Sequence, residues 1–563
     1  MSHLIHPDRL IRSASMRAAR LALAGLLTVS AVSALLITTA RPVFGQAASP
    51  DTMTVVVETP PSDLDPASSY DENSNIPLRA LYEGLVTLKG ASLTDVTPVL
   101  AASYTDQNNA HMVYTFTLRS GVTFHDGTPF DAAAAKFGLT RIVKDGFGPA
   151  GILGTFLTDP DRQIAVINPQ TLQVTFATPQ PFFLLALAAS YGTGFVSPTA
   201  VKNHTVTGSD GKPDDAHAWL QNNEAGTGPY MLTAALPSSD AFASGTPLTL
   251  KRYDPYWQGW SGSHFQQIAI RVIAESSQRR QALENGTADA ATVLLPSDIT
   301  KLTQKNTVQI DKNPTLRIDY LIMAAGYGPL KSVKARQAMC YAFDYAAYNR
   351  AELGGLGQPA NGPFPTTLLG WDNSATPCPT DLKTAVTLLQ QSGVAPGTVL
   401  TFAAPEGRGD NAAAILQQQL EQIGLELKIV KYSSNDYNNN LLPGAITADR
   451  PDFFLNSWWP DYNNPLNYSL PLFYSKSTGA SGQNAGYYAD AKVDQIIDQA
   501  QKTTDQTALL ALFKPLQTIV AKDDPAGIFM AQSPDRTVVS SAIKNQIFNV
   551  LYLGTFDFYA LSR

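Results

Sequence analysis

The chain is poor in cysteine and in charge. Its 563 residues include only two cysteines, and charged residues make up 15% of it. Two cysteines exclude a disulfide-dense scaffold and a zinc site made of four thiolates. The net charge of −7 argues against nucleic-acid binding, because a nucleic-acid-binding face must be basic. Hydrophobic residues still make up 44%, so the chain can bury the core of roughly three or four domain-sized units.

The sequence also lacks the motifs of common catalytic and metal sites. It has no G-x-S-x-G and no H-E-x-x-H, and its histidines share no ligand spacing. Residues 541–544 match S-x-x-K without its companion strings. Residues 355–360 match G-x-G-x-x-A, but Pro359 would break the helix that binds a pyrophosphate. We therefore expect no enzyme activity, no cofactor and no metal, with a hydrolase assembled from distant segments as the alternative.

The first 47 residues have the composition of a secretory signal peptide. Arg17 and Arg20 precede an apolar stretch at 21–40, and Gly45 and Ala47 suit cleavage after Ala47. Because the stretch has about 20 residues, a retained membrane anchor is the alternative. No later run approaches the roughly 18 apolar residues of a span, and no cysteine near the cut offers a lipid attachment site. We predict a mature protein that is soluble in the periplasm.

Cys340 and Cys378 would lie in an oxidising compartment, where they are able to pair. A disulfide between them would close a loop of about 38 residues, worth a few kcal/mol in the chain-entropy model. Pairing also requires their Cα atoms to lie within about 7 Å of each other. The sequence does not determine that distance, so it leaves the disulfide open.

Hydrophobic patterning predicts an α/β protein. The β-branched run at 53–60 predicts a strand. Apolar residues at helical spacing predict helices at 74–88 and 331–348, and a further helix at 411–424 leads directly into a strand at 425–430. Because short strands alternate with helices throughout, we predict mixed sheets, and the length requires at least two lobes.

The segment at 457–500, SWWPDYNNPLNYSLPLFYSKSTGASGQNAGYYADAKVDQIIDQA, resembles the signature of the family 5 extracellular solute-binding proteins of ABC transporters. That family includes oligopeptide-, dipeptide- and nickel-binding proteins. Further blocks resemble the family in its order along the chain. They are SDLDP at 62–66, YEGL at 82–85, FHDGTP at 124–129, GTGPY at 226–230, VKARQA at 333–338 and NGP at 361–363. Each block alone is a weak signal, but together they cover most of the mature chain.

The resemblance implies a periplasmic-binding-protein type two-lobe (Venus flytrap) fold with an extra inserted domain and mixed sheets. Peptide ligands of the family lie extended between the lobes and pair with strand segments by main-chain hydrogen bonds. The implied partners are a small peptide or similar solute and an ABC permease in the inner membrane, and the protein is expected to be a monomer. The expected boundaries are 1–47 for the signal peptide, 48–83, 196–315 and 531–563 for lobe I, 84–195 for the inserted domain and 316–530 for lobe II.

The resemblance also implies that Asp461 receives the α-ammonium group of a peptide. A buried ammonium is costly unless a carboxylate meets it, so an acidic residue suits this role. The alternative is that Asp461 only caps a turn before Asn463. Leu455 stands where some members of the family place an arginine for the ligand's carboxylate, and Arg408 is the candidate to replace it.

Two further segments match parts of the family that pair with the peptide backbone. In the first, at 457–459, one tryptophan is expected to face the cleft and the other the core, because neighbours on a strand alternate. For the second, at 70–73, a plain surface loop is the alternative. The candidate ligand-binding residues are thus Ser457, Trp458, Trp459, Tyr70, Asp71, Glu72 and Asn73, together with Asp461 and Arg408.

The sequence leaves the ligand open. Within the family, the alternatives to a peptide are an opine, a sugar conjugate or a metal chelate. A nickel chelate would call for a cleft histidine, and none stands near 457–500. Outside transport, the alternatives are a secreted hydrolase and a sensor or chaperone that uses the same two-lobe trap. The resemblance favours the peptide-binding subunit of an importer.

Overall fold

The structure is a computed structural model that describes residues 51–563 except 210, 361, 375–377 and 480–481. The predicted signal peptide lies outside these residues, as do Asn361 of the NGP block and two positions of the 457–500 signature. Within the described part of the chain, no helix is both long enough and apolar enough to cross a membrane.

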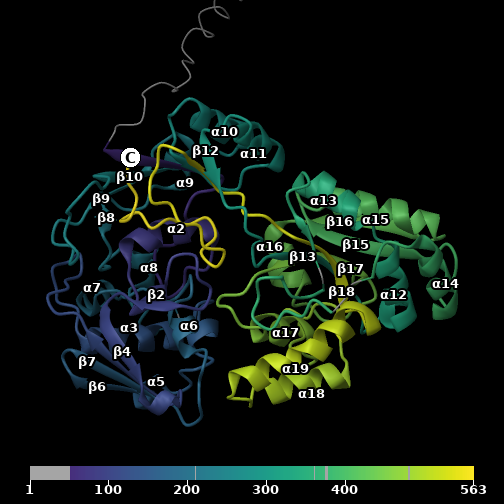
Figure 1. Cartoon of the computed structure of the whole chain (residues 1–563), viewed down its shortest axis with the longest axis horizontal. Coiled ribbons are helices and arrows are strands. Elements are labelled where there is room, and N and C mark those ends of the chain that lie inside the picture. The colour runs from purple at the N-terminus through teal and green to yellow at the C-terminus, as the bar shows by residue number, and fades with distance from the viewer. Residues whose placement is uncertain (1–50, 210, 361, 375–377, 480–481) are drawn as a thin grey trace, which may run out of the picture. The chain divides into compact units, whose positions relative to one another are not determined.

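One seven-stranded sheet collects strands from both ends of the described chain (Figure 1). β1 (Thr52–Val57) is rich in β-branched residues and is buried over all but its first residue. It pairs in parallel with β10 and β11, as expected for a strand covered on both faces. The strand order is β12 (Val308–Ile310), β19 (Val538–Ser540), β11 (Ala290–Ala291), β1, β10 (Gln267–Val272), β9 (Leu248–Arg252) and β8 (Tyr230–Leu232).

A six-stranded sheet lies in the second half of the chain. Its strands β15 and β16 pair in parallel and are joined by α15 (Asp410–Gln422), which matches the predicted helix and following strand. β13 is buried throughout. The strand order is β14 (Gln358–Pro359), β18 (Gly527–Gln532), β13 (Ile318–Met323), β17 (Phe453–Trp458), β15 (Val399–Pro405) and β16 (Glu426–Tyr432). Ala531 and Gln532, which the sequence assigned to lobe I, pair with β13 in this sheet.

The segment predicted as an inserted domain contains an antiparallel four-stranded sheet. Its order is β4 (Ala101–Asp106), β5 (Val113–Leu118), β7 (Thr171–Thr175) and β6 (Ile164–Asn168), and β2 (Val86–Leu88) pairs with β3 (Val96–Pro98) beside it in the chain. α3 (Ala132–Asp145) packs on β6 and β7. The extent of this domain and the boundaries of the two lobes remain predictions.

The chain passes twice between the seven-stranded and the six-stranded sheet. Residues 311–317 connect β12 to β13, and residues 533–537 connect β18 to β19. The two connections touch each other, because the Ser533 amide donates to the Arg317 carbonyl at 3.0 Å and the Thr315 hydroxyl donates to the Ser533 carbonyl. Two short adjacent connections between sheets are the usual construction of a hinge.

The helices differ from prediction at two places. The predicted helix at 331–348 is two helices, α12 (Val333–Ala342) and α13 (Tyr345–Leu353), because the Asp344 carboxylate accepts the Ala347 amide and so begins a new helix. The predicted helix at 74–88 ends earlier, as α2 (Glu72–Leu81). Its last carbonyl, that of Leu81, accepts the amide of Gly228 from another segment, and the chain continues into β2.

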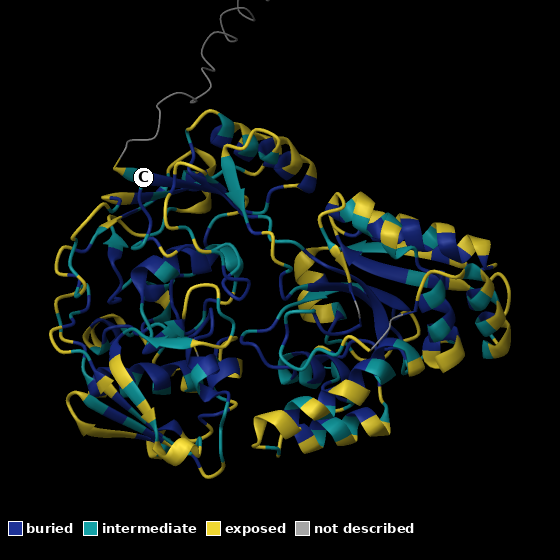
Figure 2. Ribbon diagram, viewed as in Figure 1, coloured by how far each residue is buried: buried dark blue, intermediate teal, exposed yellow. Residues whose placement is uncertain are grey.

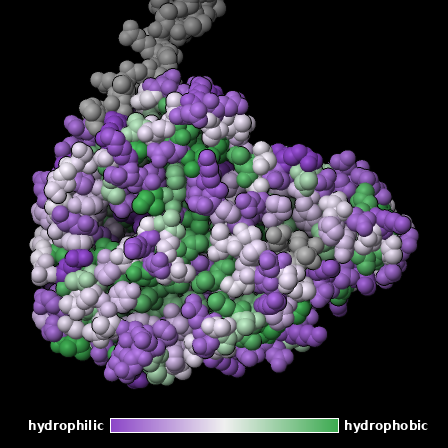
Figure 3. Space-filling view, viewed as in Figure 1, coloured by the Kyte–Doolittle hydropathy of each residue, from purple (hydrophilic) through white to green (hydrophobic). Residues whose placement is uncertain are grey.

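Helices lie beside the six-stranded sheet. Figure 1 shows α12, α14 and α15 beside the six-stranded sheet, and Figure 2 shows the strands buried while the outward sides of these helices are exposed. On the face drawn in Figure 3, apolar residues gather towards the middle and the margin is largely hydrophilic.

The remaining α-helices are α4 (Ala150–Leu153), α5 (Pro160–Gln163), α6 (Phe183–Leu187), α7 (Pro198–His204), α8 (His217–Leu220), α9 (Ser239–Ala243), α10 (Ser276–Glu284), α11 (Pro296–Thr303), α14 (Leu382–Ser392), α16 (Ser434–Asp436), α17 (Leu466–Phe473), α18 (Ala491–Ala500) and α19 (Gln506–Thr518).

Cys340 of α12 and Cys378 are both buried thiols in the structure. The Cys340 thiol donates to the Gly527 carbonyl at 3.7 Å, and the Cys378 thiol donates to the Ala521 carbonyl at 4.0 Å. The neighbouring Cys378 thiol, together with burial, raises the pKa of Cys340. The two thiols are therefore neighbours, and their oxidation to a disulfide stays a prediction.

Candidate ligand-binding site

Two predicted site residues from distant parts of the chain meet directly. The Tyr70 hydroxyl, just before α2, donates a hydrogen bond of 2.6 Å to Oδ1 of Asp461, which follows β17. Burial raises the pKa of Asp461 to about 6, and the hydrogen bond from Tyr70 partly offsets this rise. Asp461 therefore carries a carboxylate that is poorly solvated and has acceptor capacity to spare.

Asp461 does not cap the turn that follows it. Its backbone amide donates to Oδ1 of Asn467 at 3.2 Å. In the same turn, the amide of Leu466 donates a hydrogen bond to Oδ1 of Asn464 at 2.9 Å. Asparagine side chains thus satisfy these backbone amides, and the carboxylate of Asp461 faces Tyr70 instead.

Arg317 joins the two segments predicted to pair with a peptide. Its Nη2 donates to the Ser457 hydroxyl at 3.0 Å, and its Nη1 lies 3.8 Å from Oε1 of Glu72. The guanidinium carbon also lies 5.0 Å from the ring centre of Trp459, within cation–π range. Sequence reasoning missed Arg317, because it stands at the end of a hinge connection, remote in sequence from both segments.

The two tryptophans of the strand face different surroundings. Trp458 donates from Nε1 to the Asn467 carbonyl at 2.7 Å and packs against the main hydrophobic core. Trp459 lies against the guanidinium of Arg317. This alternation is the one expected of neighbouring residues at the end of a strand, and it places only Trp459 with the other candidate residues.

The segment at 70–73 divides between the site and local structure. Tyr70 and Glu72 reach Asp461 and Arg317, as described above. Asp71 is the N-cap of α2, where its carboxylate accepts the amides of Asn73 and Ser74. The Asn73 side-chain amide donates to the Thr59 hydroxyl at 2.7 Å. The structure thus gives Asp71 and Asn73 local hydrogen-bond partners, although Asn73 also lines a small pocket with Glu72 and Arg317.

Tyr191 is a second residue that the sequence did not single out. It lies in the loop after α6, and its ring centre is 4.9 Å from that of Tyr70 in an edge-to-face arrangement. The residue is buried, and burial, followed by the nearby carboxylates of Glu72 and Asp461, raises the pKa of its hydroxyl. No local motif marks this position, since only packing against Tyr70 brings it to the site.

Arg408 is not brought together with the other candidates. The residue is exposed, and among the described contacts its side chain makes no hydrogen bond or ion pair with them. Its carbonyl accepts a hydrogen bond from Lys431. Arg408 lies in the loop between β15 and α15, and the neighbouring Gly409 lies against the Leu455 side chain, in the part of β17 that precedes Ser457.

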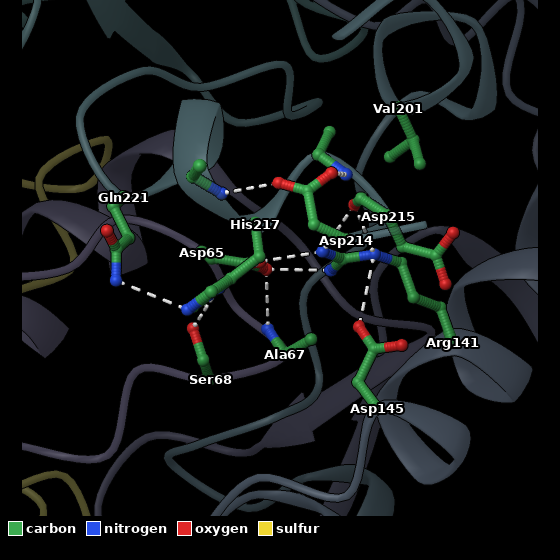
Figure 4. A network of polar contacts seen from close by, with 12 residues as sticks. Asp65, Ala67, Ser68, Arg141, Asp145, Val201, Asp214, Asp215, His217 and Gln221 are labelled. Carbon is green, nitrogen blue, oxygen red and sulfur yellow. Dashed lines mark hydrogen bonds and ion pairs between the residues drawn. The ribbon is translucent and has the colours of Figure 1, made fainter. Parts of the chain in front are cut away.

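The SDLDP block forms a separate buried network with α3, which belongs to the segment predicted as the inserted domain (Figure 4). Asp65 accepts two hydrogen bonds of 2.7 Å from Arg141 of α3, and it also lies 3.2 Å from Nδ1 of His217. The Ser68 hydroxyl contacts the same Nδ1 at 3.2 Å. Because serine and aspartate share one ring nitrogen, these residues do not have the order of a Ser-His-Asp triad.

No group of three His, Cys, Asp or Glu side chains suited to a metal ion is found among the described residues. The candidate site that the contacts above bring together consists of Asp461, Tyr70, Tyr191, Glu72, Arg317, Ser457 and Trp459. Its polar groups are those that bind an organic ion with hydrogen-bonding capacity, and aromatic rings line them.

A sequence model of the bacterial extracellular solute-binding proteins, family 5 (middle region), matches residues 95–480. Because this match covers more than half of the sequence, the chain belongs to the bacterial extracellular solute-binding proteins of family 5. The family consists of solute-binding proteins.

Similar curated proteins carry names of peptide-binding proteins. The chain is 28% identical over 537 residues to the probable D,D-dipeptide-binding periplasmic protein DdpA of Escherichia coli K12, which covers 94% of this chain and 98% of that protein. It is 26% identical over 501 residues to the di/tripeptide-binding protein 2 of Pseudomonas aeruginosa UCBPP-PA14, with 85% and 89% coverage.

Solved structures share the fold. The periplasmic binding protein DppA of Helicobacter pylori in complex with the peptide STSA superposes with a TM-score of 0.74 at 21% identity, covering 91% of this chain and 98% of that one. NikZ of Campylobacter jejuni in complex with Ni(L-His) gives a TM-score of 0.73 at 21% identity, covering 92% and 100%. The fold is thus the two-lobe periplasmic-binding-protein fold with mixed sheets, as the sequence predicted.

Proposed function

We propose that this protein is the extracytoplasmic solute-binding subunit of an ABC importer and that it binds a short peptide between its two lobes. The observation that carries the proposal is the carboxylate of Asp461, which is partly desolvated and faces Tyr70 from a segment 391 positions away. A peptide's α-ammonium is the complementary group, because its positive charge and its N–H donors pair with the negative charge and the free acceptor positions of the carboxylate. The names of the two relatives, a probable D,D-dipeptide-binding protein and a di/tripeptide-binding protein, support the same ligand class.

The proposed mechanism is closure about the two connections at 311–317 and 533–537. Lobe I contributes Tyr70 and Glu72, and lobe II contributes Ser457, Trp459 and Asp461. A ligand held by both sets stabilises the closed form only by the difference between its affinities for the closed and open forms. The closed, loaded protein would then be recognised by the permease in the inner membrane.

The remaining parts of the proposal concern location and activity. We propose that residues 1–47 direct the chain to the periplasm and are removed, and that the mature protein is a monomer. The domain boundaries proposed are those expected from the sequence, with Ala531 and Gln532 moved to lobe II because they pair with β13. Since the family is one of binding proteins, we propose no catalytic activity.

Calorimetric titration tests the function. The purified protein, first unfolded and refolded to release any trapped ligand, is titrated with a pool of di- and tripeptides and with the same pool N-acetylated. Binding of the free-amine pool alone is the expected result. Equal binding of both pools would remove the ammonium anchor at Asp461, and no binding of either pool would overturn the peptide proposal.

A further inference from the structure

Arg317 has donors to spare at the centre of the candidate site. A guanidinium has five N–H donors, and among the described residues the side chain of Arg317 makes one hydrogen bond, to Ser457. Its Nε is buried without a hydrogen-bond partner, and so is Oε1 of the facing Glu72. Unsatisfied buried donors are costly, so this arginine is better suited to a site with a ligand than to the ligand-free site.

The carboxylates near Arg317 do not satisfy it. Glu72 lies at 3.8 Å and Asp319 at 3.6 Å, and both distances exceed those of hydrogen bonds. The Oδ2 atom of Asp319 accepts hydrogen bonds from the hydroxyls of Ser533 and Tyr348, and its Oδ1 faces Nε of Arg317 without a hydrogen bond. The guanidinium therefore keeps donors for a further acceptor.

A second arginine lies beside Arg317. Arg536, in the other hinge connection, lines a pocket of about 40 Å³ together with Arg317 and the carboxylates of Glu72 and Asp535. Burial raises the pKa of Asp535 to about 6. Burial and then the positive charge of Arg317 lower the pKa of Arg536. Two guanidinium groups that disfavour each other's charge are both stabilised by an anion placed between them.

The position of Arg317 along the sheet limits the length of the ligand. Ile318 pairs with Trp458, so Arg317 is level with Trp459, two residues before Asp461. At about 3.3 Å per residue, at most about 7 Å of backbone separates that level from Asp461. An extended dipeptide has about the same length.

We propose that Arg317, supported by Arg536, binds the carboxylate of the ligand, and that the ligand is a short peptide with a free carboxyl end. This inference rests on the proposed function, because Asp461 must hold the ammonium at the other end. Trp459 fixes the plane of the guanidinium, which favours two-point binding of a carboxylate. Arg408 is the competing anchor, and its place beside Leu455, six residues before Asp461, would suit a longer peptide.

Comparison of peptide acids with peptide amides tests the inference. Ala-Ala and Ala-Ala amide, in both the all-L and the all-D form, are titrated into the wild-type protein and into the variants Arg317→Gln and Arg317→Lys. We expect the wild-type protein to bind the acid roughly 10-fold to 100-fold more tightly than the amide. This range corresponds to the loss of one hydrogen bond to a charged group. Arg317→Gln should reduce this ratio to about one, and Arg317→Lys should leave an intermediate ratio, since lysine keeps the charge but not the fork.

Arg408→Gln tests the competing anchor and should leave the acid-to-amide ratio unchanged. A ratio that persists in Arg317→Gln, or one that disappears in Arg408→Gln, would overturn the assignment of Arg317. N-acetyl-Ala-Ala separates the two proposals. If acetylation abolishes binding to the Arg317→Gln variant as it does to the wild-type protein, the ammonium site of the variant is intact. The acid-to-amide ratio then reports on Arg317 alone. If the wild-type protein binds no free-amine peptide, the proposed function fails and the role of Arg317 fails with it. Circular dichroism of each variant verifies that it is folded.

Discussion

The hydroxyl of Tyr70 donates a hydrogen bond of 2.6 Å to Oδ1 of Asp461 across 391 positions of sequence. The two residues precede α2 and follow β17, so this contact connects two segments that the sequence predicts to belong to different lobes. A carboxylate has two oxygens and about four acceptor positions. The second oxygen of Asp461 is therefore able to receive an ammonium while Tyr70 keeps its hydrogen bond.

We predict that Asp461→Asn lowers the affinity for free-amine peptides by about 100-fold or more. The reason is that loss of one partner of a buried charge pair costs about 3–5 kcal/mol. Isothermal titration with the peptide pool measures the change, and Asp449→Asn, at an exposed carboxylate, is the matched control. Unchanged affinity in the Asp461 variant would show that the ammonium binds elsewhere.

The affinity for such peptides should fall as the pH drops through about 6. In the ligand-free protein burial raises the pKa of Asp461 to about 6, above the ordinary range of aspartic acid. Below that pH the group is protonated and neutral, so it loses its attraction for an ammonium, whereas above it the charge is present. Titrations between pH 5 and pH 8 measure the midpoint.

Tyr70→Phe should move that midpoint to higher pH. The hydroxyl of Tyr70 stabilises the charged form of Asp461 and lowers its pKa, so its removal leaves the effect of burial unopposed. The shift is read from the pH dependence of peptide affinity in the variant beside that of the wild-type protein. A midpoint that stays in place, or moves down, would mean that the hydrogen bond does not persist in solution.

Arg141→Gln should lower the free energy of unfolding by about 3–5 kcal/mol, because it leaves the buried carboxylate of Asp65 without its two hydrogen bonds. Chemical denaturation measures the loss. The double variant Asp65→Asn/Arg141→Gln should recover part of it, since the side chain at position 65 is then neutral. Peptide affinity of the folded protein should be unaffected, as this network is separate from the candidate site (Figure 4). Equal stability of Arg141→Gln and the wild-type protein would contradict the prediction.

Oxidation should join Cys340 to Cys378, which are neighbouring buried thiols. Closing a loop of about 38 residues should raise the free energy of unfolding by about 3–4 kcal/mol. The measurement is thermal melting of the protein with and without dithiothreitol, beside Cys340→Ser, which should melt at the same temperature in both. A thiol count of two after treatment with an oxidant would rule the disulfide out.

Much of the fold was accessible from short stretches of sequence. The β-branched run at 53–60 forms β1, and α15 leads into β16 as its amphipathic pattern predicts. The prediction of helix boundaries was wrong where a helix ends within a continuous hydrophobic pattern. The segment at 331–348 has one helical periodicity, but Asp344 caps a second helix inside it. The capping hydrogen bond of Asp344 exists only once the chain is folded. Hydrophobic periodicity alone therefore does not reveal that one helix ends and another begins there.

The site divides in the same way. The order of blocks such as SDLDP and the 457–500 signature determined by itself the family of the chain, and with it the two-lobe fold and the prediction that Asp461 binds a ligand. Only the tertiary structure placed Tyr70 and Asp461 in contact and separated Trp459 from Trp458. It also brought Arg317 and Tyr191 to the site. The physical reason is that motifs record local chemistry, whereas a cleft between two lobes is made by contacts between residues that are hundreds of positions apart.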